Sequence, residues 1–276
     1  MKVNNRTKFI SSVFVFILIA YIGVCGYFFT IQEKIIFNPR ILDADDTYDY
    51  SFEYNERWFE PEENVKIHAI HAFTDADTVK GLVMYLHGNR GSNRTSGDRF
   101  RLFLDYGYDV IYPDYRTYGK SRGSLENESD LVSDNHFVFK EASKEYGQEN
   151  ITLVGYSLGS GVAAQVATLS DPKRLVLWTP FYSLIDVKNA EFPFLPDRIL
   201  KYPLRTDLAL KKVEEPVHIL YAEDDELLSV DRSIKLTDYL KEGDTYKVIK
   251  GQRHGGFYRN REVQFQMKKI LSENTK

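Results

Sequence analysis

The stretch that decides the fold reads ITLVGYSLGSGVAA and runs from Ile151 to Ala164. Its first four residues form a short apolar run, which is typical of a strand buried on both faces. Its last residues are mostly small and suit a helix that packs closely on a sheet. Between them, Gly155–Gly159 has the form G-x-S-x-G, which is a tight strand-to-helix turn that holds a serine hydroxyl clear of the sheet. The motif makes Ser157 the candidate nucleophile.

A glycine-rich turn with a harmless serine is the alternative interpretation of Gly155–Gly159. The apolar run before the motif and the Ala-rich helix after it favour the nucleophile, because the motif requires that context. A helix that begins at the serine also directs its free N–H groups and its dipole toward developing negative charge. We therefore expect Ser157 to attack a substrate and the N–H of Leu158 to be one oxyanion donor.

Strand-like and helix-like segments alternate on both sides of this stretch. The predicted strands are Val65–Phe73, which alternates as a half-buried strand does, Gly81–Leu86, Asp109–Tyr112, Ile151–Val154, Leu175–Trp178, Val217–Tyr221 and Asp244–Lys250. The predicted helices are Thr95–Tyr106, Ser129–Tyr146, Leu158–Leu169, Asp231–Lys241 and Arg261–Ser272. This alternation predicts a mostly parallel, doubly wound α/β sheet, whose ligands bind at the carboxyl ends of the strands.

The loop after Gly81–Leu86 reads His87-Gly88-Asn89. A tetrahedral intermediate needs a second N–H donor opposite the one that follows the serine, and this loop can supply it. We expect that donor to be the N–H of Asn89 rather than that of Arg90. His87 precedes the serine in the chain, so we interpret it as a structural residue of the loop and not as a base.

In enzymes with this motif the chain order is serine, acid, histidine. Of the histidines after Ser157, His218 lies within a predicted strand, whereas His254 follows the last strand in a loop beside two glycines. His254 is therefore the expected general base. The acid should follow Val217–Tyr221, where Ala222–Glu226 carries four carboxylates, most of which must belong to a solvated turn. Spacing alone leaves Asp224 and Asp225 open.

The N-terminal part contains no charged residue from Phe9 to Gln32. As a helix, Phe9–Phe29 would be about 31 Å long, enough to cross a bilayer core. A cleaved signal peptide is the alternative, but its apolar part would be shorter and no A-x-A site follows. Basic residues before this segment and acidic residues after it predict a cytoplasmic N-terminus, 1–8, a transmembrane anchor, 9–29, a linker, 30–50, and an extracytoplasmic domain, 51–276.

The distribution of charge excludes one class of partner. The chain has 36 basic and 40 acidic residues. Three of the basic residues precede the apolar segment, so the remainder carries 33 basic and 40 acidic residues, a net charge of −7. An acidic domain without basic clusters argues against nucleic acid as a partner. The single cysteine, Cys25, lies in the apolar segment, so the rest of the chain has no disulfide and no thiolate nucleophile.

Several motifs together resemble the α/β-hydrolase family, and most closely its signal-anchored branch of Bem-type and depalmitoylase-like α/β-hydrolase-domain proteins. The resemblance extends from about Gln32 to the end of the chain. The segments that carry it are Gln32–Pro39 after the anchor, Leu86–Asn89 at the oxyanion loop, Asp114–Ser121 (DYRTYGKS), Gly155–Gly159 and Thr179–Leu184, which opens a short lid. The resemblance implies an α/β-hydrolase fold with a small lid, here residues 181–215.

The acid motif of that family, H-G-x-x-D-x-x-V-P, aligns with Tyr221–Ser229 and implies that Asp225 is the acid. The sequence departs from the family at four positions, where Tyr221, Ala222 and Ser229 replace the usual His, Gly and Pro and Thr117 replaces a glycine. The substrate preference of the family therefore does not transfer.

Together these features predict a membrane-anchored serine hydrolase that cleaves esters or thioesters through an acyl-enzyme, without a cofactor or a metal. The expected substrate is a small-molecule or lipid acyl ester. A serine peptidase or aminopeptidase of the same fold is one alternative, although no acidic pair clearly forms a pocket for an N-terminal amine. A catalytically inactive anchored binding module is the other, and the intact set of Ser157, Asp225 and His254 argues against it.

Overall fold

The computed structural model describes residues 5–95 and 97–273, and its centre is an eight-stranded sheet with the strand order β10-β9-β8-β7-β4-β6-β3-β2. Neighbouring strands from β6 to β10 are parallel, whereas β3 is antiparallel to both β6 and β2. A separate small sheet pairs β1 with β5. The strands are β1 (Asn38–Pro39), β2 (Tyr54–Phe59), β3 (Ile67–Ala72), β4 (Leu82–Leu86), β5 (Arg90–Gly91), β6 (Asp109–Pro113), β7 (Ile151–Tyr156), β8 (Arg174–Trp178), β9 (Val217–Ala222) and β10 (Thr245–Ile249).

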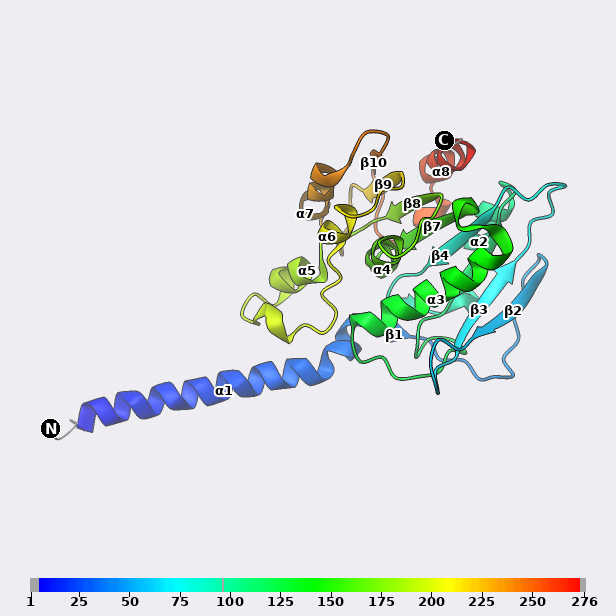
Figure 1. Cartoon of the computed structure of the whole chain (residues 1–276). Coiled ribbons are helices and arrows are strands. Elements are labelled where there is room, and N and C mark those ends of the chain that lie inside the picture. The colour runs from blue at the N-terminus through cyan, green and yellow to red at the C-terminus, as the bar shows by residue number, and fades with distance from the viewer. Residues whose placement is uncertain (1–4, 96, 274–276) are drawn as a thin grey trace.

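Helices cover both faces of the sheet (Figure 1), with α3 and α4 on one face and α2 and α8 on the other. The sequence explains the helix ends: Asn127 and Asp130 form a capping box that begins α3, and Gly147 ends that helix. The helices are α1 (Asn5–Ile36), α2 (Gly97–Leu104), α3 (Glu128–Tyr146), α4 (Leu158–Ala167), α5 (Leu184–Glu191), α6 (Thr206–Leu210), α7 (Val230–Ser233) and α8 (Arg261–Ser272).

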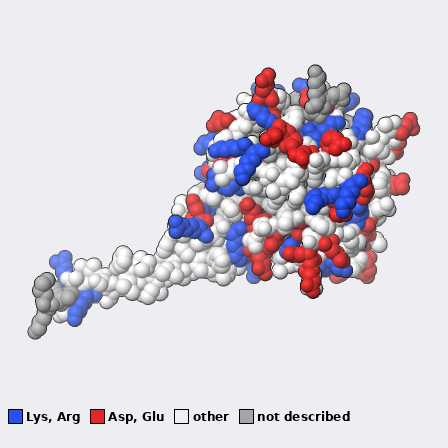
Figure 2. Space-filling model, viewed as in Figure 1, with Lys and Arg blue, Asp and Glu red and all other residues white. Residues whose placement is uncertain are grey.

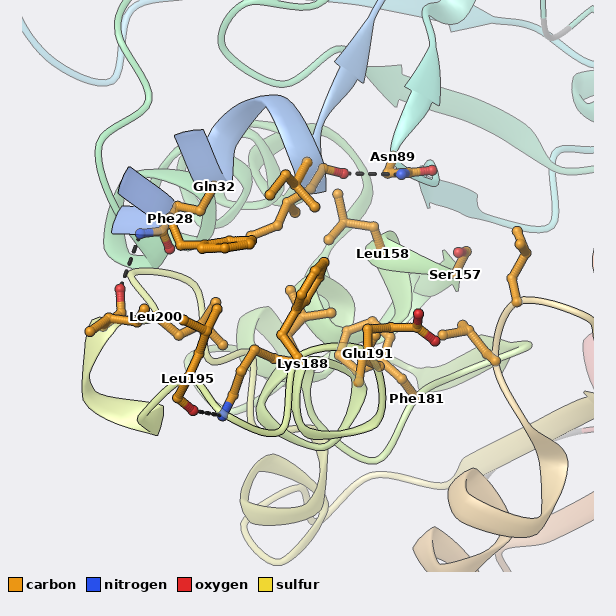
Figure 3. A pocket seen from close by; sticks show the side chains of 18 residues that line it. Phe28, Gln32, Asn89, Ser157, Leu158, Phe181, Lys188, Glu191, Leu195 and Leu200 are labelled. Atoms are coloured by element: carbon orange, nitrogen blue, oxygen red, sulfur yellow. Dashed lines mark hydrogen bonds between the residues drawn. The ribbon is translucent and has the colours of Figure 1, made fainter. Parts of the chain in front are cut away.

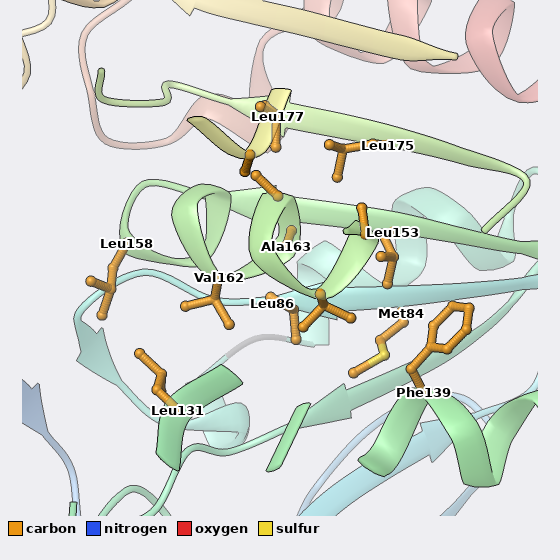
Figure 4. Packing of buried hydrophobic residues seen from close by; sticks show 14 of the residues in the cluster. Met84, Leu86, Leu131, Phe139, Leu153, Leu158, Val162, Ala163, Leu175 and Leu177 are labelled. Carbon is orange, nitrogen blue, oxygen red and sulfur yellow. The ribbon is translucent and has the colours of Figure 1, made fainter. Parts of the chain in front are cut away.

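The core consists of two apolar layers, one on each face of the sheet. Alternate residues of β4 enter different layers: Leu82, Met84 and Leu86 pack toward α3 and α4, whereas Val83 and Tyr85 pack toward α2 and α8. Figure 4 shows the first layer, where Val162 and Ala163 of α4 lie over the strands. Because both faces are covered, the central strands are apolar throughout, as the sequence predicted.

The predicted doubly wound, mostly parallel sheet is confirmed, and each predicted strand is present. The half-buried character expected for Val65–Phe73 is wrong, because every residue of β3 is buried. His68 and His71 interrupt its apolar pattern but have partners, at 2.8 Å from Glu56 Oε2 and 2.9 Å from the Tyr146 hydroxyl. Desolvation lowers the pKa of His68 to about 4, so this ring is buried neutral.

Two elements differ from the sequence-based prediction. The edge strand β2 was not predicted, because its sequence, YNERWF, carries charged and polar side chains among its aromatic residues and lacks a continuous apolar run. The helix predicted over Asp231–Lys241 is instead the short α7 followed by a 3₁₀ helix, Ile234–Tyr239. Ser96, within the predicted helix Thr95–Tyr106, lies outside the described residues.

The helix α1 contains the predicted anchor and extends from the globular part as a long arm (Figure 1). It is long and apolar enough to cross a membrane, and the apolar part of it is exposed. Figure 2 shows this arm free of charged side chains along most of its length, in contrast to the mixed charges of the globular part. Residues 1–4 of the expected cytoplasmic N-terminus and residues 274–276 of the expected domain lie outside the described residues.

The segment expected to be a linker, 30–50, has a different structure. The helix continues through Ile36, β1 follows it at once, and Leu42 and Tyr48 are buried in the core. The physical reason is that this stretch carries apolar side chains that gain free energy by burial against the sheet. The anchor is therefore joined to the globular part without a flexible connection.

Candidate active site

Ser157 lies at the turn between β7 and α4, with backbone angles of φ 53° and ψ −119°. A positive φ is uncommon for a residue other than glycine and indicates a strained turn. The two glycines of the motif are required because neighbouring backbone atoms approach them closely. A Cβ added to Gly155 would lie 2.4 Å from the Gly159 carbonyl oxygen, and one added to Gly159 would lie 2.1 Å from the Leu86 oxygen. Larger side chains at these positions would force the turn apart.

The structure brings the three predicted site residues together from three loops. The His254 Nε2 atom lies 3.0 Å from the Ser157 hydroxyl oxygen. The other ring nitrogen, Nδ1, lies 2.7 Å from Asp225 Oδ2. Since a carboxylate can only accept, Nδ1–H donates to Asp225 and Nε2 is left to accept the hydroxyl proton of Ser157. Both side chains are largely buried, with exposed fractions of 8% for His254 and 3% for Asp225.

Geometry separates the two candidate acids that spacing left open. Asp225 Oδ1 accepts hydrogen bonds from the backbone N–H groups of Leu227, at 2.9 Å, and Leu228, at 2.7 Å, which fixes the carboxylate toward His254. Asp224 is exposed. The next residue, Glu226, had no predicted role. Its carboxylate accepts a hydrogen bond from the His254 backbone N–H at 3.1 Å and so holds the histidine loop.

The two predicted oxyanion donors lie beside the serine. Leu158 is the first residue of α4, so its N–H has no acceptor within the helix. Asn89 lines the same cavity as Ser157 and Leu158. Arg90 belongs instead to β5, where it pairs with Asn38. The loop approaches the serine closely, because a Cβ added to Gly88 would lie 3.4 Å from the Ser157 Cβ.

Two tyrosines hold the loop that carries Asn89. The Tyr115 hydroxyl donates to the His87 carbonyl and the Tyr118 hydroxyl to the Asn89 carbonyl, each at 2.7 Å. Both tyrosines belong to the DYRTYGKS motif, from which no role for them was predicted. The position of that motif directly after β6, the neighbour of β4 in the sheet, could have indicated that the tyrosines lie beside the loop after β4.

His87 is buried and does not contact the serine hydroxyl. Its Nδ1–H donates to the Gly88 carbonyl at 2.6 Å, and its ring stacks on Tyr115 at 4.1 Å between centroids. Burial lowers the pKa of His87 to about 3, so the ring is neutral near pH 7. Burial also raises the pKa of the neighbouring Asp114 carboxyl, which accepts from the Asn93 N–H. His87 therefore shapes the loop, as the sequence analysis expected.

An apolar cavity of about 290 Å³ opens beside Ser157. Its wall includes residues of the segment predicted as a lid, among them Phe181, Leu184, Val187, Leu195 and Leu200. The opposite wall comes from the end of α1, which no sequence signal predicted. Figure 3 shows Ser157 at one end of the cavity and Phe28 and Gln32 of α1 at the other. Among the described residues, no group of three or more potential ligands could hold a metal ion.

Known proteins share the fold of this chain and part of its sequence. A family model described as "Serine aminopeptidase, S33" matches residues 77–206, which include the oxyanion loop and Ser157 but end before Asp225 and His254. The esterase Pf2001 of Pyrococcus furiosus superimposes with a TM-score of 0.69 at 19% identity, covering 86% of this chain and 97% of the esterase. The chain belongs to the α/β-hydrolase superfamily.

Curated relatives of this α/β-hydrolase include the lysophosphatidylserine lipase ABHD12 of Danio rerio, 27% identical over 255 residues, or 76% of this chain. The chain spans 66% of the length of that lipase and 55% of its Xenopus tropicalis counterpart. The uncharacterized protein Rv2307c of Mycobacterium tuberculosis is 29% identical over 177 residues, covering 62% of each chain. The predicted enzyme class, a serine hydrolase, agrees with the lipase and esterase relatives.

A second strained residue lies in the loop that supports the oxyanion loop. Thr117, at the position where the family resemblance expects glycine, has φ 72°. This region is unfavourable for a β-branched side chain. The position thus retains the backbone conformation of a glycine without the residue that adopts it freely.

We expect Thr117→Gly to stabilise the protein by about 1 kcal/mol, because relief of backbone strain exceeds the added entropy of the unfolded chain. Urea unfolding of the full chain measures this difference. The matched control is Thr168→Gly at the end of α4, where φ is −71° and glycine should destabilise. A loss of stability in both variants would contradict the assignment of strain to Thr117.

Proposed function

We propose that the protein is a membrane-anchored serine hydrolase that cleaves carboxylic esters or thioesters of acyl chains through an acyl-enzyme. The observation that carries this proposal is the chain of contacts Ser157–His254–Asp225 at the end of an apolar cavity. Nucleophile, base and orienting acid in this order are the arrangement that activates a serine hydroxyl for acyl transfer.

In the first step, His254 Nε2 takes the hydroxyl proton of Ser157 while its oxygen attacks the substrate carbonyl carbon. The Leu158 and Asn89 N–H groups stabilise the resulting oxyanion, and the N-terminus of α4 adds a favourable dipole. His254 then returns the proton to the leaving oxygen or sulfur as the bond to it breaks. In the second step His254 takes a proton from water while the water oxygen attacks the acyl carbon, and it returns that proton to the Ser157 oxygen as the carboxylic acid is released. Asp225 keeps the imidazole oriented and stabilises its charged form.

The cavity supports an acyl chain better than a peptide. Its described lining is mostly apolar, with Lys188 and Glu191 as its charged side chains. The Lys188 ammonium donates to the Leu195 carbonyl and to Asp197 Oδ1, each at 2.6 Å, so it is already paired. Glu191 alone does not form the acidic pair sought for an N-terminal amine. An aminopeptidase activity, suggested by the name of the matching family model, is therefore the second candidate.

The helix α1 supports the membrane anchor of this proposal. Arg6 and Lys8 precede its apolar part, and Glu33 follows it. By the positive-inside rule, the N-terminus is cytoplasmic and the catalytic domain extracytoplasmic. The anchored domain would encounter acyl esters at the membrane surface.

The first test of the proposal is covalent labelling. A fluorophosphonate should label the full chain, whereas Ser157→Ala should remain folded and unlabelled and lose several orders of magnitude in kcat, because the site residues act as a unit. Ser170→Ala is the matched control, since Ser170 lies just beyond the opposite end of α4, and it should label normally. Labelling that persists in Ser157→Ala would remove this serine from the mechanism.

The second test separates the adjacent acids. Asp225→Asn should lower kcat by about 10³–10⁴-fold, because it disturbs the tautomer and charge of His254. Asp224→Asn is the matched control, and its effect on ester hydrolysis should be far smaller since this carboxylate is exposed. The reverse ranking would assign the acid to Asp224.

A further inference from the structure

The tip of the segment after α5 packs along the anchor helix. The Tyr21 hydroxyl donates to the Phe194 carbonyl at 2.9 Å. The Phe28 ring lies 5.1 Å from that of Phe192 and 5.9 Å from that of Phe194. Residues 192–194 are therefore joined to α1 over about two helical turns.

This contact lies within the part of α1 that is apolar. Tyr21 precedes Phe29, the last residue of the predicted span, by eight positions, or about 12 Å along a helix. When α1 crosses a bilayer, the tip at Phe194 lies at a similar depth and faces hydrocarbon. The Phe194 side chain suits that position, because it is aromatic and 51% exposed. The tip is thus a second contact with the membrane beside the anchor.

Polar contacts fasten the same two elements nearer to the catalytic domain. The Gln32 side chain donates to the Ile199 carbonyl at 3.0 Å and accepts from the Lys201 backbone N–H at 2.8 Å. The Lys201 ammonium lies 2.8 Å from Glu33 Oε1. These contacts fix α1 against residues 199–201 at the edge of the apolar segment.

The cavity that reaches Ser157 lies between these two elements. On one side it is lined by Phe28, Gln32, Ile35 and Ile36 of α1, and on the other by residues that include Phe192, Leu195, Ile199 and Leu200. Figure 3 shows α1 and the segment around Leu195 and Leu200 on opposite sides of the space that leads toward Ser157. The lining is mostly apolar from Phe192, beside the tip, to Leu158, beside the serine.

We propose that the end of α1 and residues 192–200 form a membrane-embedded entrance, through which an acyl chain passes sideways from the bilayer into the cavity. The chain then reaches Ser157 without exposure of its methylene groups to water, which would be unfavourable. The helix is in this view a wall of the substrate site as well as an anchor. This inference rests on the proposed acyl-hydrolase function. It adds the route by which the acyl chain enters and the helix that helps to bind it.

The direct test uses the full chain in phosphatidylcholine vesicles. The probe is a long-chain fluorophosphonate with a photoreactive diazirine at the far end of its chain. It should phosphonylate Ser157 and, on illumination, form a crosslink to residues 28–36 of α1, located by mass spectrometry. Labelled Ser157 with crosslinks in neither α1 nor residues 192–200 would overturn the entrance while leaving the hydrolase intact. A chain that never labels at Ser157 would overturn the proposed function itself, and the entrance with it.

A matched pair of variants tests the same route by blocking it. Ile35→Trp should lower the labelling rate with the long-chain probe by about tenfold more than the rate with a methyl fluorophosphonate. The larger side chain would fill part of the cavity, which only the long chain has to occupy. Ile22→Trp makes the same change on the same helix, at a residue outside the cavity lining, and should leave the ratio of the two rates unchanged. Equal ratios in the two variants would contradict the proposal.

Discussion

The constraint on which the site depends is the close approach of the β7–α4 turn to the end of β4. Gly159 lies so near the Leu86 carbonyl that any side chain there would collide with it, and this contact holds Ser157 in its strained conformation. The adjacency of β4 and β7 in the sheet brings the 87–89 loop beside the serine. The parallel order of the remaining strands then delivers Asp225 after β9 and His254 after β10 to the same edge.

A second constraint joins this site to the anchor. The Asn89 side chain donates to the Ile36 carbonyl at the end of α1, at 3.0 Å, and the Asn38 N–H donates to the Asn89 carbonyl at 2.8 Å. Pairing of β1 with β5 continues this connection along the chain. The candidate oxyanion loop is thus braced on one side by Tyr115 and Tyr118 and on the other by the anchor helix. Movement of α1 relative to the domain would disturb the position of Asn89.

Sequence reasoning could predict the features that depend on local pattern. The apolar runs gave the buried strands, and the glycines of the elbow indicated a backbone that only small residues permit. Chain order selected His254 over His218, which the structure places within β9. Two features could not be predicted from local pattern. The choice between Asp224 and Asp225 required the family resemblance, because these adjacent residues are of the same type and differ only in the direction of their side chains. The contacts of α1 with residues 192–201 required three-dimensional packing, because they join segments about 170 positions apart.

In the proposed mechanism the strained Ser157 forms a covalent acyl intermediate. Rapid-quench measurement on an activated long-chain ester, combined with mass spectrometry of the intact protein and of its peptides, would detect this intermediate. We expect a burst of alcohol release of about one equivalent per active chain when deacylation is the slower step, and an acyl adduct on the peptide that contains Ser157. Sustained turnover with the adduct on another residue would contradict it.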